Sequence, residues 1–112
     1  MQSSILTTIK KMLGIDSSYE HFDTDIIINI NSVLMTLQQL GVGPEDGFSI
    51  EGSSEKWSDF IEQRKDLEAI KTYIYLKVKL LFDPPTNSFS IDSYERQAKE
   101  FEWRLNVRAE GE

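Results

Sequence analysis

The segment from Ile70 to Pro85 (IKTYIYLKVKLLFDPP) constrains the fold more than any other part of the chain. At about 100° per residue, its apolar side chains form two separate stripes on one helix, and long lysine side chains lie between the stripes. Pro84 and Pro85 then stop the helix, because proline lacks an amide hydrogen and disfavours helical geometry in the residue before it.

A surface helix of a small monomer needs only one apolar stripe. Two stripes predict a central helix, or a helix that packs one stripe inside its own subunit and offers the other to a neighbour. The first stripe contains Leu67, Ile70, Ile74, Val78 and Leu81, and the second contains Ala69, Tyr73, Leu76 and Leu80.

Length and composition predict a single domain. A chain of 112 residues can bury a core without covalent cross-links, and the absence of cysteine excludes disulfides and thiolate metal sites. Residues 1–13 alternate apolar and polar side chains, so we expect no signal peptide. The apolar runs are too short to span a bilayer, and we expect synthesis in the cytoplasm and no membrane contact.

The net charge of −7 argues against tight binding to nucleic acid, which requires clustered lysine and arginine. Most of the excess acid lies between residues 16 and 66. Two interpretations remain open: an ordinary soluble acidic surface, or a surface that must not hold DNA.

The remaining pattern predicts an all-α fold, a small bundle of about four helices with one long loop. Ser3 or Ser4 caps a first helix that ends at Gly14, and Asp23 caps a second that ends at Gly41. The loop over residues 41–53 contains a possible short extended piece at 48–50.

A short helical stretch after the loop is predicted to begin at a cap on Ser53 or Ser54. Its side chains at Trp57, Phe60 and Ile61 point inward. The pattern leaves open whether this stretch joins the helix over 66–82 directly or kinks near residue 64.

The last helix is predicted to start at Ser90 or Asp92, after a loop anchored by Phe89. Its core side chains are Tyr94, Ala98, Phe101 and Leu105. We expect residues 1–107 to form the domain and residues 108–112 a flexible tail.

Trp103 and Val107 lie almost opposite that core stripe, beside Arg96. An apolar patch that contains tryptophan and arginine is typical of a protein–protein interface. The alternative is that Trp103 folds over the loop around Phe89.

The sequence contains no pattern typical of catalysis or of cofactor binding. His21 is the single histidine and lies in a polar link, which favours a solvated side chain over a metal ligand. The glycines at 41, 43 and 47 fit no phosphate-binding motif, and no serine has a base and an acid at motif spacing. We therefore expect a protein that is not an enzyme, with no cofactor and no metal.

Asn31 lies off the core stripe of its helix, and we expect it to be solvated.

Four segments together resemble the head–tail connector (adaptor) proteins of tailed bacteriophages and prophages. They are DTDIIININSVLMTLQQLGVGP, KWSDFI, IKTYIYLKVKLLFDPP and ERQAKEFEWRLN, and the likeness covers about Asp23 to Asn106. The stretch from Tyr73 to Pro85 and the closing EWRLN carry the most specific part of the resemblance.

The resemblance implies a structural virion protein at the head–tail junction, made in the bacterial cytoplasm. It implies a ring of about twelve copies that binds the portal protein and extends the DNA channel, through which DNA passes without specific binding. The ring would also dock a stopper or tail-completion protein. We expect the subunit or portal interface to include Tyr73, Leu76, Leu80, Arg96, Trp103, Arg104, Val107 and Arg108.

A second hypothesis is a cytoplasmic helical adaptor or regulator that binds another phage or bacterial protein through the same apolar patch. It predicts a small defined complex and absence from purified virions. A DNA-binding regulator is a weaker variant, because the last helix alternates basic and acidic residues.

Overall fold

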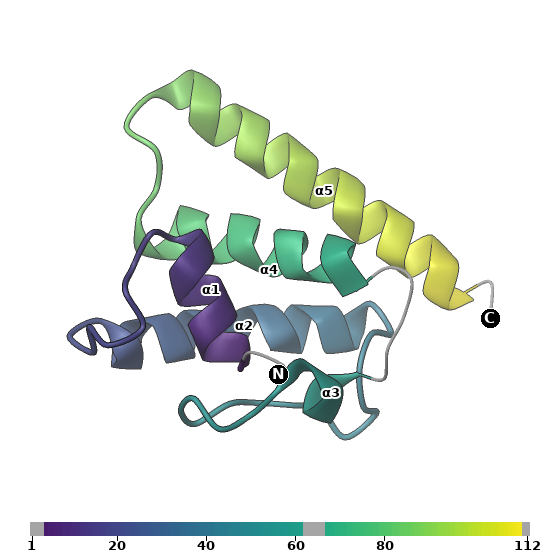
Figure 1. The fold of residues 1–112 in the computed structure, drawn as a ribbon. Helices are drawn as coiled ribbons and strands as arrows, with labels where there is room; N and C mark the ends of the chain where they lie inside the picture. Colours follow the sequence, from purple (N-terminus) through teal and green to yellow (C-terminus); the bar gives the residue numbers. More distant parts are fainter. Residues whose placement is uncertain (1–3, 62–66, 111–112) are drawn as a thin grey trace.

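The computed structural model describes residues 4–61 and 67–110, with side chains up to residue 107. Five helices follow one another along the chain, and no strand forms in the described ranges (Figure 1). The predicted all-α bundle is confirmed, and the extended piece at 48–50 runs without strand partners. The helices are α1 (Ile5–Met12), α2 (Asp23–Gln39), α3 (Trp57–Phe60), α4 (Leu67–Phe82) and α5 (Ser88–Glu110).

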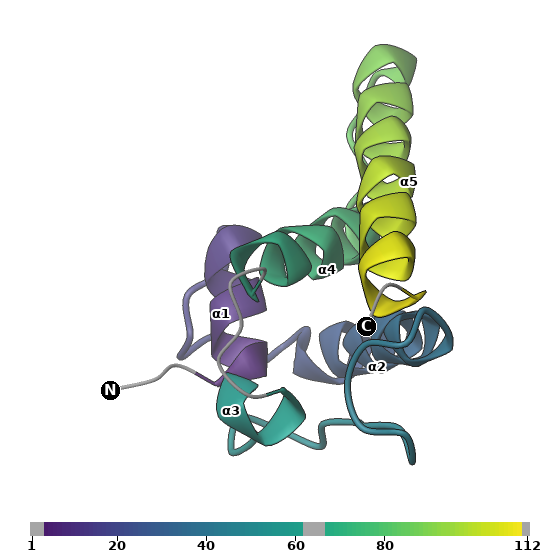
Figure 2. The same ribbon diagram turned by 90° about the vertical axis from the view of Figure 1, so that its right-hand side faces the viewer.

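Helix α4 is the centre of the bundle. This confirms the first of the two alternatives predicted from its apolar stripes, a central helix. It packs against α1, α2 and α5; Figure 1 shows it between α2 and the inclined α5, and Figure 2 shows it beside α5 and above α2. Ile70, Ile74 and Val78 of the first stripe are fully buried, while Tyr73 of the second reaches α5 through a hydrogen bond to Glu102. Both stripes therefore pack largely within one subunit.

Helix α1 begins and ends where its sequence predicts. The Ser4 side chain caps it by accepting a hydrogen bond from the Thr7 amide at 3.0 Å, and Gly14 follows its last turn with a φ of +83°. The predicted cap of α2 is wrong by one position. Phe22 precedes the first turn, and the carboxylate of Asp23 instead pairs with a lysine of α1.

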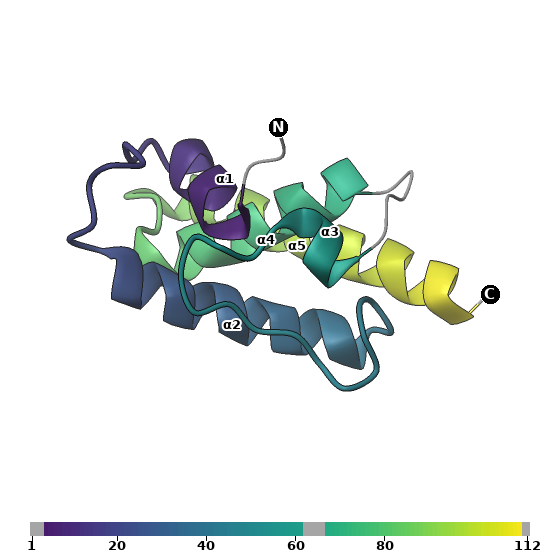
Figure 3. The same ribbon diagram turned by 60° about the horizontal axis from the view of Figure 1, so that its bottom comes forward.

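The long loop after α2 is held to the core by a side chain that we expected to be solvated. The Asn31 amide donates to the Ile50 carbonyl at 3.0 Å, and its oxygen accepts from the Ile50 amide at 2.8 Å. This pairing satisfies both backbone groups of Ile50, whose side chain is buried. The expectation for Asn31 is wrong because the loop folds back along α2 (Figure 3).

Trp57, Phe60 and Ile61 are buried, as predicted, but the cap of α3 is neither Ser53 nor Ser54. The helix follows Lys56, and the carboxylate of Asp59 accepts the Lys56 amide. Whether α3 joins α4 concerns residues 62–66, which lie outside the described residues.

Helix α5 starts at Ser88 instead of Ser90 or Asp92, because the Asn87 side chain accepts the Ser90 amide at 2.7 Å. Its core positions at Ala98 and Leu105 are buried, with two half-buried aromatic side chains on the same stripe. The helical backbone continues to Glu110, past the predicted domain end at residue 107. A flexible tail stays a prediction, and residues 111–112 lie outside the described residues.

Candidate interaction surfaces

The side of α5 that faces away from the bundle carries large apolar side chains in solvent. Phe89 is 79% exposed, Trp103 67% and Val107 46%. Phe89, Arg96 and Trp103 are spaced by seven residues and so lie on one side of the helix. We call Phe89, Arg96, Trp103 and Val107 the outer face of α5. Single exposed apolar residues are ordinary, but a row of them on one helix indicates a surface that another molecule covers.

Trp103 does not fold over the loop at the start of α5. Fourteen residues of helix separate it from Phe89, a distance of about 21 Å along the helix axis. That alternative is therefore wrong, and so is the expectation that Phe89 anchors its loop to the core.

Three other residues of the predicted interface lie on α4, and two of them are buried inside the subunit. Tyr73 is fully buried and Leu76 is 4% exposed, because α5 of the same chain covers the second stripe. They are not available at the surface of a subunit, and this part of the expectation is corrected. Leu80 is half-buried in a shallow groove between α4 and α5.

The basic residues of the predicted interface differ in their surroundings. Arg96 is exposed on the outer face of α5. Arg104 is exposed and pairs with Glu100 one turn earlier, at 2.6 Å. The side chain of Arg108 lies outside the described residues. The structure thus brings Arg96, Trp103 and Val107 together on one face, and an interface role for them stays a prediction.

A large open groove among the described residues has no signature in the sequence pattern. It lies where the end of α1, the start of α2 and the end of α4 meet, and its volume is about 680 Å³. We call it the end groove, and it is lined by Leu13, Ile15, Phe22, Asp25, Ile28, Asn29, Leu81, Phe82 and Asp83.

Several apolar side chains in the end groove remain in contact with solvent. Ile28 is 60% exposed and Leu81 is 55% exposed, although the sequence places Leu81 on a core stripe. The ring of Phe22 stacks edge-on against Phe82 with centroids 5.4 Å apart, which joins the link before α2 to the end of α4. The groove forms where residues 13–29 meet the end of α4, which is distant in sequence, so no local pattern could have revealed it.

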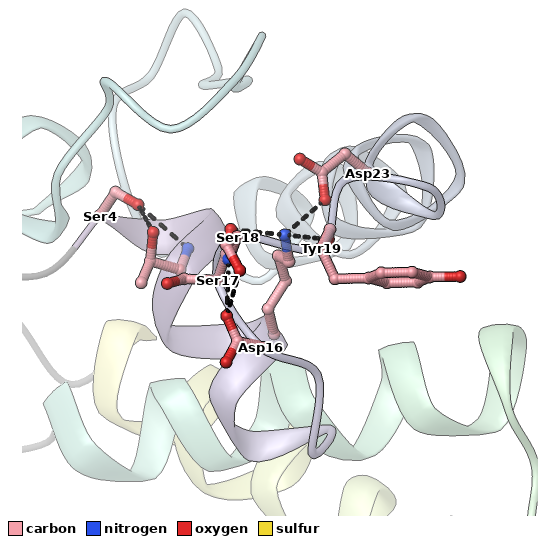
Figure 4. A network of polar contacts seen from close by, with 8 residues as sticks. Ser4, Asp16, Ser17, Ser18, Tyr19 and Asp23 are labelled. Atoms are coloured by element: carbon pink, nitrogen blue, oxygen red, sulfur yellow. Dashed lines mark hydrogen bonds and ion pairs between the residues drawn. The ribbon is translucent and has the colours of Figure 1, made fainter.

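A buried lysine anchors the link that contributes Leu13, Ile15 and Phe22 to the end groove. Lys10 on α1 is 2% exposed, and its amine pairs with the Asp23 carboxylate at 2.7 Å. The amine also donates to the backbone carbonyls of Ser17 and Tyr19, at 3.2 and 2.7 Å. Figure 4 shows these groups gathered around one amine. We call this arrangement the Lys10 clamp. It holds the link over residues 13–22 against α1 and α2 because every partner lies in that link or just after it.

The same link contains a perturbed carboxyl group. The hydroxyl and the amide of Ser18 both donate to Asp16, at 2.6 and 2.9 Å, and these hydrogen bonds hold the pKa of Asp16 below its ordinary value. On α4, burial raises the pKa of Tyr73 far above its ordinary value, and the hydrogen bond that its hydroxyl donates to Glu102 acts in the same direction. Each shift has a structural cause, and neither group lies in a cavity that suits a reaction.

Two further observations on the described ranges concern potential metal ligands and long apolar helices. His21 is exposed, and no group of three or more potential metal ligands gathers within the described ranges. No described helix is both long and apolar enough to cross a membrane.

A family model described as phage connector protein matches residues 5–112, almost the whole chain. The chain belongs to the phage connector protein family. The connector family is structural, and its members associate with other phage head and tail proteins at the head–tail junction. Comparisons with curated proteins and with solved structures found no match for this connector.

Proposed function

We propose that this connector forms a ring of about twelve copies beneath the portal protein, extends the DNA channel and docks the stopper or tail-completion protein. The observation that carries the proposal is the outer face of α5, where Trp103 is 67% exposed on a helix whose opposite side is packed in the core. A side chain of this size in water indicates a contact that the isolated subunit lacks.

The charge of the chain supports the part of the proposal that concerns DNA. With 19 acidic and 12 basic residues, the connector carries a net charge of −7. A basic channel wall would bind each phosphate and retard the passage of DNA, while an acidic wall lets it slide. The ring is therefore a conduit through which DNA passes without specific binding.

The test is to mix the purified connector with the portal protein encoded in the same phage genome, and to examine the mixture by native mass spectrometry and electron microscopy. We expect rings of the connector on the portal, with about twelve copies per ring. A connector that stays monomeric and shows no affinity for the portal contradicts the proposal. A small defined complex with another protein, absent from purified virions, favours the adaptor hypothesis instead.

A further inference from the structure

The two exposed apolar surfaces lie at opposite ends of the connector. The end groove is formed by the start of α2 and the ends of α1 and α4, whereas Trp103 and Val107 belong to the last third of α5. Figures 1 and 3 both show these helix ends on opposite sides of the molecule, whose longest dimension is 40 Å. Trp103 and Val107, in the C-terminal part of the outer face of α5, therefore cannot reach the end groove of their own chain.

We propose that the end groove of one copy receives the C-terminal part of the outer face of α5 from the next copy, with Trp103 and Val107 in the groove. This inference rests on the proposed ring, and it names the surfaces by which the ring closes. Two different surfaces at opposite ends form a head-to-tail contact, and such contacts generate rings when the rotation between copies closes.

The charges of the two surfaces are complementary. The lining of the groove includes Asp25 and Asp83 and contains no lysine or arginine among the described residues. Between Arg96 and Val107, the exposed charged residues of α5 are three cations and one acid, namely Arg96, Lys99, Arg104 and Glu100. Acids alternate with these cations along α5, but Glu102 is half-buried and bonded to Tyr73 and Lys77, so cations outnumber acids on the exposed surface beside Trp103.

Asp83 already contacts Lys79 at 2.9 Å, so Asp25 is the better placed acid for a basic residue of the neighbour.

The size and chemistry of the groove also suit this occupant. A volume of about 680 Å³ holds the space of roughly twenty water molecules, and much of its wall is exposed leucine, isoleucine and phenylalanine. Inserting an indole ring and a valine expels that water from apolar surface, which is favourable.

The chain supplies matched control positions for a test. Ile28 and Met35 are both 60% exposed and lie seven residues apart on α2, but only Ile28 lines the end groove. Trp103 and Phe89 are both exposed on the outer face of α5, but only Trp103 lies in its C-terminal part.

Ring assembly on the portal is measured for four variants of the full chain by electron microscopy and by titration. We expect I28D and W103A to raise the concentration needed for half-assembly by roughly 30-fold or more, the size typical of an interface hot spot. M35D and F89A are expected to change it less than about threefold. Thermal unfolding followed by circular dichroism checks that all four variants fold.

Cross-linking gives a second measurement that does not depend on loss of assembly. The chain has no cysteine, so thiols introduced by I28C and V107C in one molecule are its only thiols. A short bis-maleimide added to assembled rings should give a ladder of covalent multimers with this pair, at least about tenfold more than with the pair M35C and V107C.

Rings that form equally well from I28D and M35D, together with no excess of cross-links over the control pair, overturn the inference and leave the proposed function intact. A wild-type connector that forms no ring with its portal overturns the proposed function, and the inference falls with it.

Discussion

Replacing Lys10 by methionine tests whether the Lys10 clamp stabilises the fold. Methionine keeps the apolar stem of the side chain in place but removes the amine. The Asp23 carboxylate then loses its cation, and the carbonyls of Ser17 and Tyr19 lose a donor. We expect the variant to fold, but with a lower free energy of unfolding.

Breaking a fully buried ion pair by removing one partner costs about 3–5 kcal/mol. Here the Lys10 side chain is 3% exposed, but that of Asp23 is 25% exposed, so water can solvate the orphaned carboxylate. We therefore expect a loss near the lower limit, about 3 kcal/mol. At an unfolding entropy of about 2.1 cal/mol/K per residue, this loss lowers the Tm of a chain of 112 residues by about 13 °C.

The assay is urea unfolding at neutral pH followed by far-UV circular dichroism, with a thermal scan of the same variants. Lys11 provides the matched control, because it lies next to Lys10 on α1 but is exposed. K11M should change the free energy of unfolding by less than about 0.5 kcal/mol. A double-mutant cycle of K10M with D23N should show coupling of about 1–3 kcal/mol. Equal losses in K10M and K11M, or no coupling in the cycle, would refute the reasoning.

Three further predictions concern α4, the long loop and the link before α2. Burial raises the pKa of Tyr73 above its ordinary value of 10.0, so its neutral form stabilises the fold below pH 10 and this contribution is lost as the pH rises further. Y73F should therefore flatten the decline of unfolding free energy between about pH 9.5 and 11.5 in urea titrations, and an unchanged slope contradicts this cause. Gly43 has a φ of +93°, and an added Cβ would lie 2.5 Å from a buried phenylalanine ring, so G43A should lose about 2–3 kcal/mol in the same assay. S18A removes the hydroxyl that donates to Asp16 but keeps the amide bond, so an NMR titration should find the pKa of that carboxyl closer to its ordinary value. An unchanged pKa would assign the shift to the amide alone.

Local patterns predicted the helices well, because each helix buries a continuous stripe whose spacing is visible in the sequence. Apolar spacing located α2 and α4, and glycines marked the ends of α1 and α2. Caps were less predictable. Asp23 has the chemistry of an N-cap, but a buried lysine nearby offers it a stronger partner, and Asn87 caps α5 from a position that resembled an ordinary loop.

Of the two candidate interaction surfaces, the sequence pattern predicted the outer face of α5 but not the end groove. The outer face of α5 repeats along one helix, so Trp103 and Val107 could be assigned to it from periodicity. The end groove depends on how three segments meet, and the exposure of Leu81 follows from the absence of a neighbour and not from its place on a stripe. Lys10 and Asn31 escaped prediction likewise, because their partners belong to loops whose course the sequence pattern does not define.

The angle at which α5 crosses α4 acquires a particular importance if the copies join as proposed. Helix α4 ends in the groove and α5 carries the inserted tryptophan, so their crossing fixes how far each copy is rotated from the last, about 30° for twelve copies. Ala98 is 2% exposed on the side of α5 that faces α4, and a bulkier side chain there would tilt one helix against the other. A tilt of a few degrees, repeated around the circle, would change the number of copies at closure. Ala98, a single small residue in the core, would thereby determine the diameter of the DNA channel.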